Sequence, residues 1–124
     1  MTDITFNKID DDFTDEYNKL QALYDDDQLD QCIKDATALL DDPAMPRYHR
    51  MKTLTLLASC LPDFEQADEC RARAETYWRI KRACYKEGQS EVVDKALGDL
   101  RTILDDLKNA FAEEWEAMHG TDVQ

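Results

Sequence analysis

The chain has 124 residues and a formal net charge of -13 at pH 7, with 35% charged and 43% hydrophobic residues. This length suffices for a single domain with its own apolar core, and only three glycines and three prolines interrupt it, which favours an all-α fold over a fibrous or disordered chain. The acidity argues against direct binding of nucleic acid, because phosphate recognition depends on basic side chains, and it favours a protein or peptide partner with a basic surface.

The first twelve residues show little periodicity and end in three consecutive aspartates. We expect residues 1–12 to form a loose acidic N-terminal arm, with the alternative that Ile4, Phe6 and Ile9 pack against the domain. This segment lacks the basic and apolar regions of a signal peptide, and no run of about 18 apolar residues follows. The sequence therefore predicts an intracellular protein, cytoplasmic or nuclear, without a membrane span.

Residues 13–119 are predicted to form one domain of about five helices, followed by a disordered tail at 120–124. The first helix is expected over residues 14–25, with Thr14 as its N-cap. The second is expected over residues 28–40, because apolar side chains recur there at steps of three and four, and Pro43 follows its end.

The remaining three helices are longer on average. One is expected over residues 46–59, and the next begins near Phe64 and meets no breaker before Gly88, which predicts about 23 residues. Ser90 is placed to cap the last helix. Its apolar stripe comprises Val93, Leu97, Leu100, Leu104, Leu107, Phe111, Trp115 and Met118. We expect this stripe to pack antiparallel on the fourth helix; in the alternative, part of it mates with a second copy of the chain in a homodimer.

One set of apolar residues recurs 35 positions later with the same spacing. The two sets are Leu29, Cys32 and Leu39, and Phe64, Ala67 and Ala74. Each falls on the second helix of an expected helical hairpin. A fixed period of this size is typical of stacked hairpins that bury their apolar faces against one another.

The second set resembles the second-helix signature of tetratricopeptide repeats, in which an aromatic residue is followed by two small ones. Asp63-Phe64-Glu65-Gln66-Ala67 and then Ala74 carry this resemblance, which covers about residues 14–80. It implies two hairpins whose first helices line a groove for a peptide, with the last helix covering the exposed end. The alternative is an ordinary helical bundle in which the recurrence is a coincidence.

The resemblance implies a partner-binding groove along the first and third helices. Its candidate residues are Tyr17, Gln21, Tyr24, His49, Lys52, Leu56 and Ser59. This set does not reproduce the Lys and Asn pattern by which one subfamily grips chaperone tails, so an extended or helical peptide is the expected ligand. For each tyrosine, ordinary packing between hairpins is the alternative.

Charge is distributed unevenly along the chain. Residues 1–45 carry 13 acidic and 3 basic side chains, residues 46–90 carry 6 and 9, and residues 91–124 carry 9 and 3. Four basic residues, Arg71, Arg79, Arg82 and Lys86, are expected close to one face of the fourth helix. Such a basic strip either pairs with the acidic helices beside it or binds an acidic partner.

Residues capable of catalysis or metal binding are scattered. His49 and His119 are 70 positions apart, the four cysteines form no Cys-x-x-Cys pair, and Asp25-Asp26-Asp27 lacks the glycine and glutamate of a calcium loop. We therefore predict no enzyme, no catalytic residues, no metal and no cofactor, and expect the cysteines to be small buried apolar groups.

Three hypotheses for function follow. The first is a non-catalytic adaptor or scaffold that presents the groove to a peptide or protein. The second is a small structural or regulatory subunit that oligomerises through its last helix. The third is an acidic decoy that occupies basic, nucleic-acid-binding surfaces.

Overall fold

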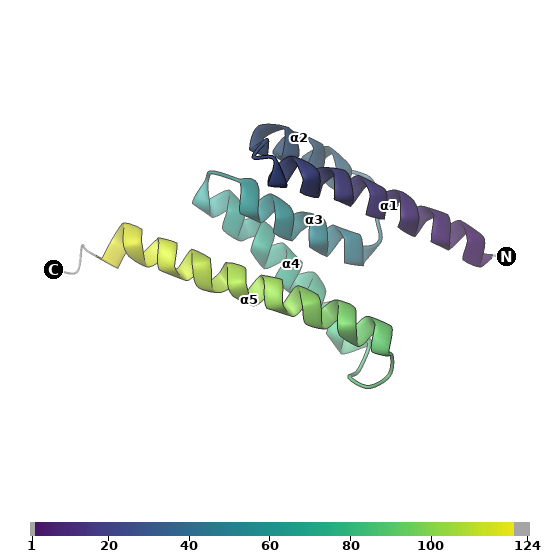
Figure 1. Ribbon diagram of the computed structural model, residues 1–124. Coiled ribbons are helices and arrows are strands. Elements are labelled where there is room, and N and C mark those ends of the chain that lie inside the picture. Colours follow the sequence, from purple (N-terminus) through teal and green to yellow (C-terminus); the bar gives the residue numbers. More distant parts are fainter. Residues whose placement is uncertain (1, 121–124) are drawn as a thin grey trace.

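The computed structural model describes residues 2–120, with side chains from Lys8 onward. Over this range the predicted all-α fold with five helices is confirmed (Figure 1). The helices are α1 (Thr2–Asp25), α2 (Leu29–Leu40), α3 (Arg47–Cys60), α4 (Phe64–Cys84) and α5 (Glu91–His119). The tail expected to be disordered lies outside the described residues, apart from Gly120.

The helices stack in sequence order. α1 and α2 form one hairpin and α3 and α4 the next; α3 packs on both α1 and α2, and α5 packs in the same way on both α3 and α4. As predicted, α5 runs antiparallel to α4. Figure 1 shows α1, α3 and α5 side by side in front, with α2 and α4 behind them. Two layers result, a front layer of three helices and a rear layer of two.

The 35-residue recurrence has a structural counterpart at the start of each rear helix. Leu29 is the first residue of α2 and Phe64 is the first residue of α4. Cys32 and Ala67, one turn further, are both buried, and so is Ala74. Small side chains at these positions let a rear helix approach its neighbours closely, because little volume separates the two backbones.

α1 differs from the sequence-based expectation. It begins at Thr2 rather than at Thr14, so the prediction of a loose arm is wrong over residues 2–12. Neither glycine nor proline interrupts this stretch, and two residues near its end, together with the adjoining Phe13, attach it to the domain. Ile9 is half-buried, Phe13 is buried, and the Asp10 carboxylate lies 2.6 Å from Nε2 of His49 on α3. The three aspartates lie on exposed positions of a helix, where their charge remains solvated.

Side-chain caps fix the starts of α4 and α5. The backbone N–H of Gln66 donates to the Asp63 carboxylate at 3.0 Å, and that of Val93 donates to the Ser90 hydroxyl at 3.3 Å. The Ser90 cap is thus confirmed. Each cap satisfies a backbone donor that the first helical turn leaves without a partner.

α4 ends earlier than predicted, at Cys84 after 21 residues. Tyr85 is extended, with φ of -123°, and the Arg82 guanidinium donates to its carbonyl oxygen. Gly88 then adopts φ of +89°, a conformation that side chains disfavour, while its N–H donates to Asp94 at 2.9 Å. Contacts within the turn therefore stop the helix before the glycine is reached.

The core runs through the contact between the two layers. Leu20, Leu54 and Leu104, one from each front helix, are buried in the same cluster as Cys32 and Ala74 of the rear helices. A second cluster joins three further residues of α3 and α5, namely Met51, Leu97 and Leu100. The first cluster thus extends from α1 to α5, and the second lies beside it between α3 and α5.

Three of the four cysteines are buried, as expected, while Cys84 at the end of α4 is exposed. The thiols of Cys32 and Cys60 are 3.6 Å apart, and the Cys32 thiol also donates to the Leu20 carbonyl oxygen. Burial raises the pKa of Cys60 to about 12. Cys32 and Cys60 are therefore held as neutral thiols that contribute to packing between the hairpins.

Candidate partner-binding surfaces

The groove predicted on α1 and α3 is partly filled by the protein itself. Two of its residues, His49 and Leu56, are only 3% and 6% exposed. His49 is bound to Asp10 and packs against the rings of Phe13 and Tyr48, with centroid distances of 6.0 and 5.6 Å. These two side chains are therefore engaged inside the domain, because the N-terminal extension of α1 covers the start of α3 and Leu56 packs in the core.

Three other groove residues, Tyr17, Gln21 and Lys52, belong to one polar cluster. The Lys52 ammonium lies 4.1 Å from the centroid of the Tyr17 ring and 5.4 Å from that of Tyr48. The Tyr17 hydroxyl donates to Gln21 at 3.3 Å, and Gln21 donates to Asp25. Burial lowers the pKa of Lys52 and raises that of Tyr17. These groups are therefore already engaged with one another, through cation–π contacts and hydrogen bonds.

The last two groove residues, Tyr24 and Ser59, are exposed. The Ser59 hydroxyl donates to the carbonyl oxygen of Thr55 in its own helix at 3.1 Å. The predicted groove set thus separates into a buried pair, a self-contained polar cluster and two exposed residues.

Most of the basic strip is engaged in ion pairs. Arg71 binds Asp68 at 2.8 Å and Arg79 binds Glu75 at 3.0 Å, both within α4, while Arg82 binds Asp94 of α5 at 2.7 Å. Lys86 is exposed and lies beyond the end of α4, contrary to the expectation that all four share that helix. The strip is therefore not a continuous free surface for an acidic partner.

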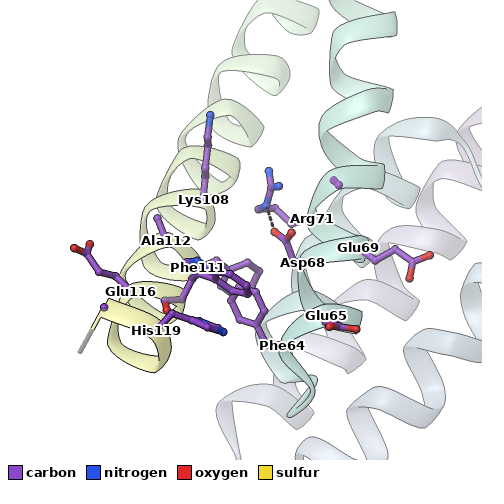
Figure 2. Close-up of a pocket in the computed structure, with 13 residues that line it drawn as sticks. Phe64, Glu65, Asp68, Glu69, Arg71, Lys108, Phe111, Ala112, Glu116 and His119 are labelled. Carbon is purple, nitrogen blue, oxygen red and sulfur yellow. Dashed lines mark hydrogen bonds and ion pairs between the residues drawn. The ribbon is translucent and has the colours of Figure 1, made fainter. Parts of the chain in front are cut away.

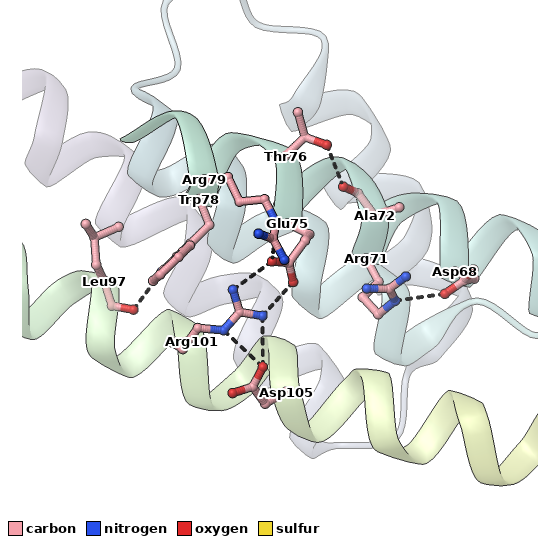
Figure 3. Close-up of polar contacts among 10 residues, drawn as sticks. All are labelled: Asp68, Arg71, Ala72, Glu75, Thr76, Trp78, Arg79, Leu97, Arg101 and Asp105. Atoms are coloured by element: carbon pink, nitrogen blue, oxygen red, sulfur yellow. Dashed lines mark hydrogen bonds and ion pairs between the residues drawn. The ribbon is translucent and has the colours of Figure 1, made fainter. Parts of the chain in front are cut away.

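A bidentate ion pair also joins α4 to α5, and here the acidic residue lies on α4 and the basic residue on α5 (Figure 3). Both terminal nitrogens of Arg101 donate to the Glu75 carboxylate, at 2.7 and 2.5 Å, and Arg101 also binds Asp105. Its guanidinium lies 4.6 Å from the Trp78 ring centroid, and Trp78 donates to the Leu97 carbonyl oxygen at 2.8 Å. Hydrogen bonding to Arg101 lowers the pKa of Glu75. Sequence reasoning missed this pair, because nothing in the local pattern aligns residues 75 and 101.

A cleft of about 810 Å³ lies between the start of α4 and the end of α5 (Figure 2). We call it the aromatic cleft and define its floor by Phe64, Phe111, Trp115 and His119. The Phe64 ring is 5.8 Å from that of Phe111 and 5.9 Å from that of Trp115, and the Trp115 and His119 rings stack at 3.7 Å. Its charged rim comprises Glu65, Asp68, Glu69, Arg71, Lys108 and Glu116.

The floor of the aromatic cleft remains open to solvent. Trp115 is 51% exposed, and neighbouring Met118 is 47% exposed. Large apolar groups gathered in one place on a surface are a mark of interaction sites, whereas isolated exposed ones are ordinary. The periodicity of the sequence predicts that Phe111 and Trp115 lie on the apolar stripe of α5, where they pack on α4 or mate with a second copy, but it gives no indication of a cleft with Phe64.

No protein-family model matches the chain, and neither the curated proteins nor the solved structures yield a significant match. Among the described side chains, no three His, Cys, Asp or Glu residues are grouped so that they could hold a metal ion. Within residues 2–120, no helix is both long and apolar enough to cross a bilayer.

Proposed function

We propose that this protein is a non-catalytic interaction module that holds a peptide or protein segment in the aromatic cleft. The observation that carries the proposal is the exposed group of aromatic rings shared by α4 and α5. Rigid aromatic side chains contribute a large contact area at low entropic cost and dominate many interfaces. The proposal includes an adaptor or scaffold role inside the cell, which rests on the sequence alone.

The order of helix packing supports this proposal. α5 lies on α3 and α4 as α3 lies on α1 and α2, which is the relation expected between successive units of a tetratricopeptide-like array. In such an array the last helix keeps one uncovered side. We therefore propose that the aromatic cleft lies at the open end of a short helical-repeat scaffold, a position available to a ligand.

The test compares three forms of the protein as bait in native cell extract. These are the wild type, a Trp115→Ala variant and a Val92→Ala control, in which an exposed apolar residue distant from the cleft is truncated. We expect one or more proteins to be retained by the wild type and the control and lost from Trp115→Ala. Their binding should then be reproduced with purified components. Equal retention by all three forms would reject the cleft as the binding surface.

A second surface merits a parallel measurement, because the Tyr17–Lys52–Tyr48 contacts lie where the resemblance implies a groove. Replacing Tyr17 and Tyr24 with Ala should weaken partner capture without unfolding if that face binds. The structure favours the cleft over this face, since the polar groups of the cluster already satisfy one another.

The homodimer alternative loses most of its proposed surface. Leu104 is buried, and Leu107 and Phe111 pack against the core, so Trp115 alone of the stripe residues from Leu104 to Trp115 is largely exposed. Sedimentation of the wild type and of Trp115→Ala over a range of concentrations measures whether what remains supports self-association.

A further inference from the structure

We infer that the ligand of the aromatic cleft is a basic amphipathic helix supplied by another protein. This inference rests on the proposed function and specifies the chemistry of the partner. It follows from three properties of the cleft: its shape between two helices, the spacing of its aromatic rings, and the charges on its rim.

The shape and spacing fit a helix. Phe111, Trp115 and His119 follow one another at steps of four along α5, so they form a row inclined by roughly 26° to the helix axis. Phe64 of α4 lies against the rings of Phe111 and Trp115, and Figure 2 shows it opposite Phe111. This row spans roughly 12 Å, or two helical turns at about 1.5 Å per residue. A groove between two helices with an apolar floor is a common receptor for the apolar face of a third helix, whose anchors recur at steps of three and four.

The charges on the rim of the cleft indicate which charges the ligand helix carries beside its apolar face. Asp68 and Arg71 neutralise each other at 2.8 Å. Glu65, Glu69 and Glu116 make no ion pair within the described part of the chain, and Lys108 is the one other basic residue that lines the cleft. Figure 2 shows two of these glutamates on α4 and the third on α5. Carboxylates on both sides of an apolar floor complement Lys or Arg side chains that flank the apolar stripe of a ligand helix.

A second copy of this chain complements the cleft poorly. Each copy carries a net charge of -13, and the C-terminal segment from residue 91 is itself acidic, with 9 acidic and 3 basic side chains. Bringing two such surfaces together places like charges close to one another, which disfavours association. Charge complementarity therefore assigns the cleft to a basic segment of a different protein.

The test uses three designed 14-residue peptides that share Leu at one set of positions spaced by three and four. Their remaining positions are mainly Lys in the first peptide, Gln in the second and Glu in the third. Each carries a fluorescent label, and binding to the full chain is measured by fluorescence anisotropy at moderate salt. We expect the Lys peptide to bind at least about tenfold more tightly than the Glu peptide, with the Gln peptide between them, because rim carboxylates attract one and repel the other.

Two sets of variants locate the site. Trp115→Ala should weaken binding of the Lys peptide at least about tenfold, as expected for loss of an aromatic anchor, whereas Val92→Ala should leave it unchanged. Changing Glu65, Glu69 and Glu116 together to Gln should weaken it about fivefold or more. A matched control changes the exposed residues Asp11, Asp15 and Asp41 to Asn, which alters the net charge equally, but these residues lie on α1 and at the C-cap of α2. Circular dichroism confirms that all variants fold.

The outcomes separate the inference from the proposed function. If all three peptides bind equally well and all depend on Trp115, the cleft remains a binding site and its preference for a basic helix is rejected. Equal weakening by the two triple variants, or no dependence on Trp115, would show attraction by overall charge and would also overturn the inference. A concentration-dependent dimer that is lost in Trp115→Ala would assign the cleft to a second copy. The extract experiment above judges the proposed function independently.

Discussion

The two halves of α5 carry one continuous apolar stripe but lie in different surroundings. In the first half, Leu97, Leu100 and Leu104 are covered by α3 and α4. In the second half, Trp115 and Met118 remain about half exposed although they continue the same stripe. Since all five side chains are large and apolar, the difference comes from the helices beside them. The stripe marks which side chains can be buried, and the neighbouring helices determine which of them are.

The charged residues of the two halves also differ, in whether they form ion pairs with neighbouring helices. Near the first half, Asp94 and Arg101 are paired with Arg82 and Glu75 of α4. Near the second half, Glu116 makes no ion pair within the described residues. The first half is therefore attached to the domain by both apolar and polar contacts, whereas the second offers both kinds of group to a ligand.

The largest loss of stability is expected on truncating Leu104, in the buried half of α5. This side chain is fully buried where α5 meets the core. Leu104→Ala should lower the free energy of unfolding by about 2–5 kcal/mol, because it removes buried apolar volume and leaves a cavity. Urea denaturation followed by circular dichroism measures the change. A loss below about 1 kcal/mol would show that the first half of α5 is not part of the core.

An intermediate effect is expected at Glu75. Glu75→Gln should lower the free energy of unfolding by about 1–3 kcal/mol at pH 7, because Arg101 loses its charged hydrogen-bond partner. Pairing with Arg101 lowers the pKa of Glu75 below 4.5. The carboxylate thus stabilises the fold above pH 4.5, and this contribution disappears as the pH falls through the lowered pKa.

The change of melting temperature with pH provides a control for the prediction at Glu75. The melting temperature of the wild type should fall more steeply between pH 5 and pH 3 than that of Glu75→Gln. Glu113→Gln makes the same change at an exposed residue of α5 that forms no ion pair among the described side chains, so it should retain the wild-type slope. Identical slopes for all three proteins would contradict the assigned role of the Glu75–Arg101 pair.

The smallest effect on stability is expected at Trp115. Its ring is half exposed and contacts Phe64 and His119 at the edge of the fold. Trp115→Ala should change the free energy of unfolding by less than about 1 kcal/mol, as is usual for surface positions, although it removes the proposed anchor for a ligand. A loss of 2 kcal/mol or more in urea denaturation would place Trp115 in the structural core and weaken the comparison.

Local sequence signals predicted the helices well where the chain itself carries the information. The start of α2, the break at Pro43 and the Ser90 cap depend on backbone geometry and on hydrogen bonds over a few residues. The same reasoning was wrong for residues 2–12. There the helix is attached by Asp10 and Phe13 to His49, which is more than 30 positions away, and no local pattern reports such a contact.

The candidate site was less predictable than the fold. Periodicity placed Phe111 and Trp115 on one face of α5, but it could not bring Phe64 next to them, because that contact depends on how α5 crosses α4. Likewise, the residue types and spacing of His49 and Leu56 are compatible with a groove on the surface. Only the packing of the helices shows that both side chains are buried.

By itself, the sequence determined that the chain folds into amphipathic helices joined in hairpins, because helix periodicity, capping and the position of prolines act over a few residues. Tertiary structure alone decided which apolar and charged groups were left without partners. Burial and ion pairing depend on the distances between helices far apart in the chain, and those distances leave the aromatic cleft open while they bury His49 and Leu56 of the groove expected on α1 and α3.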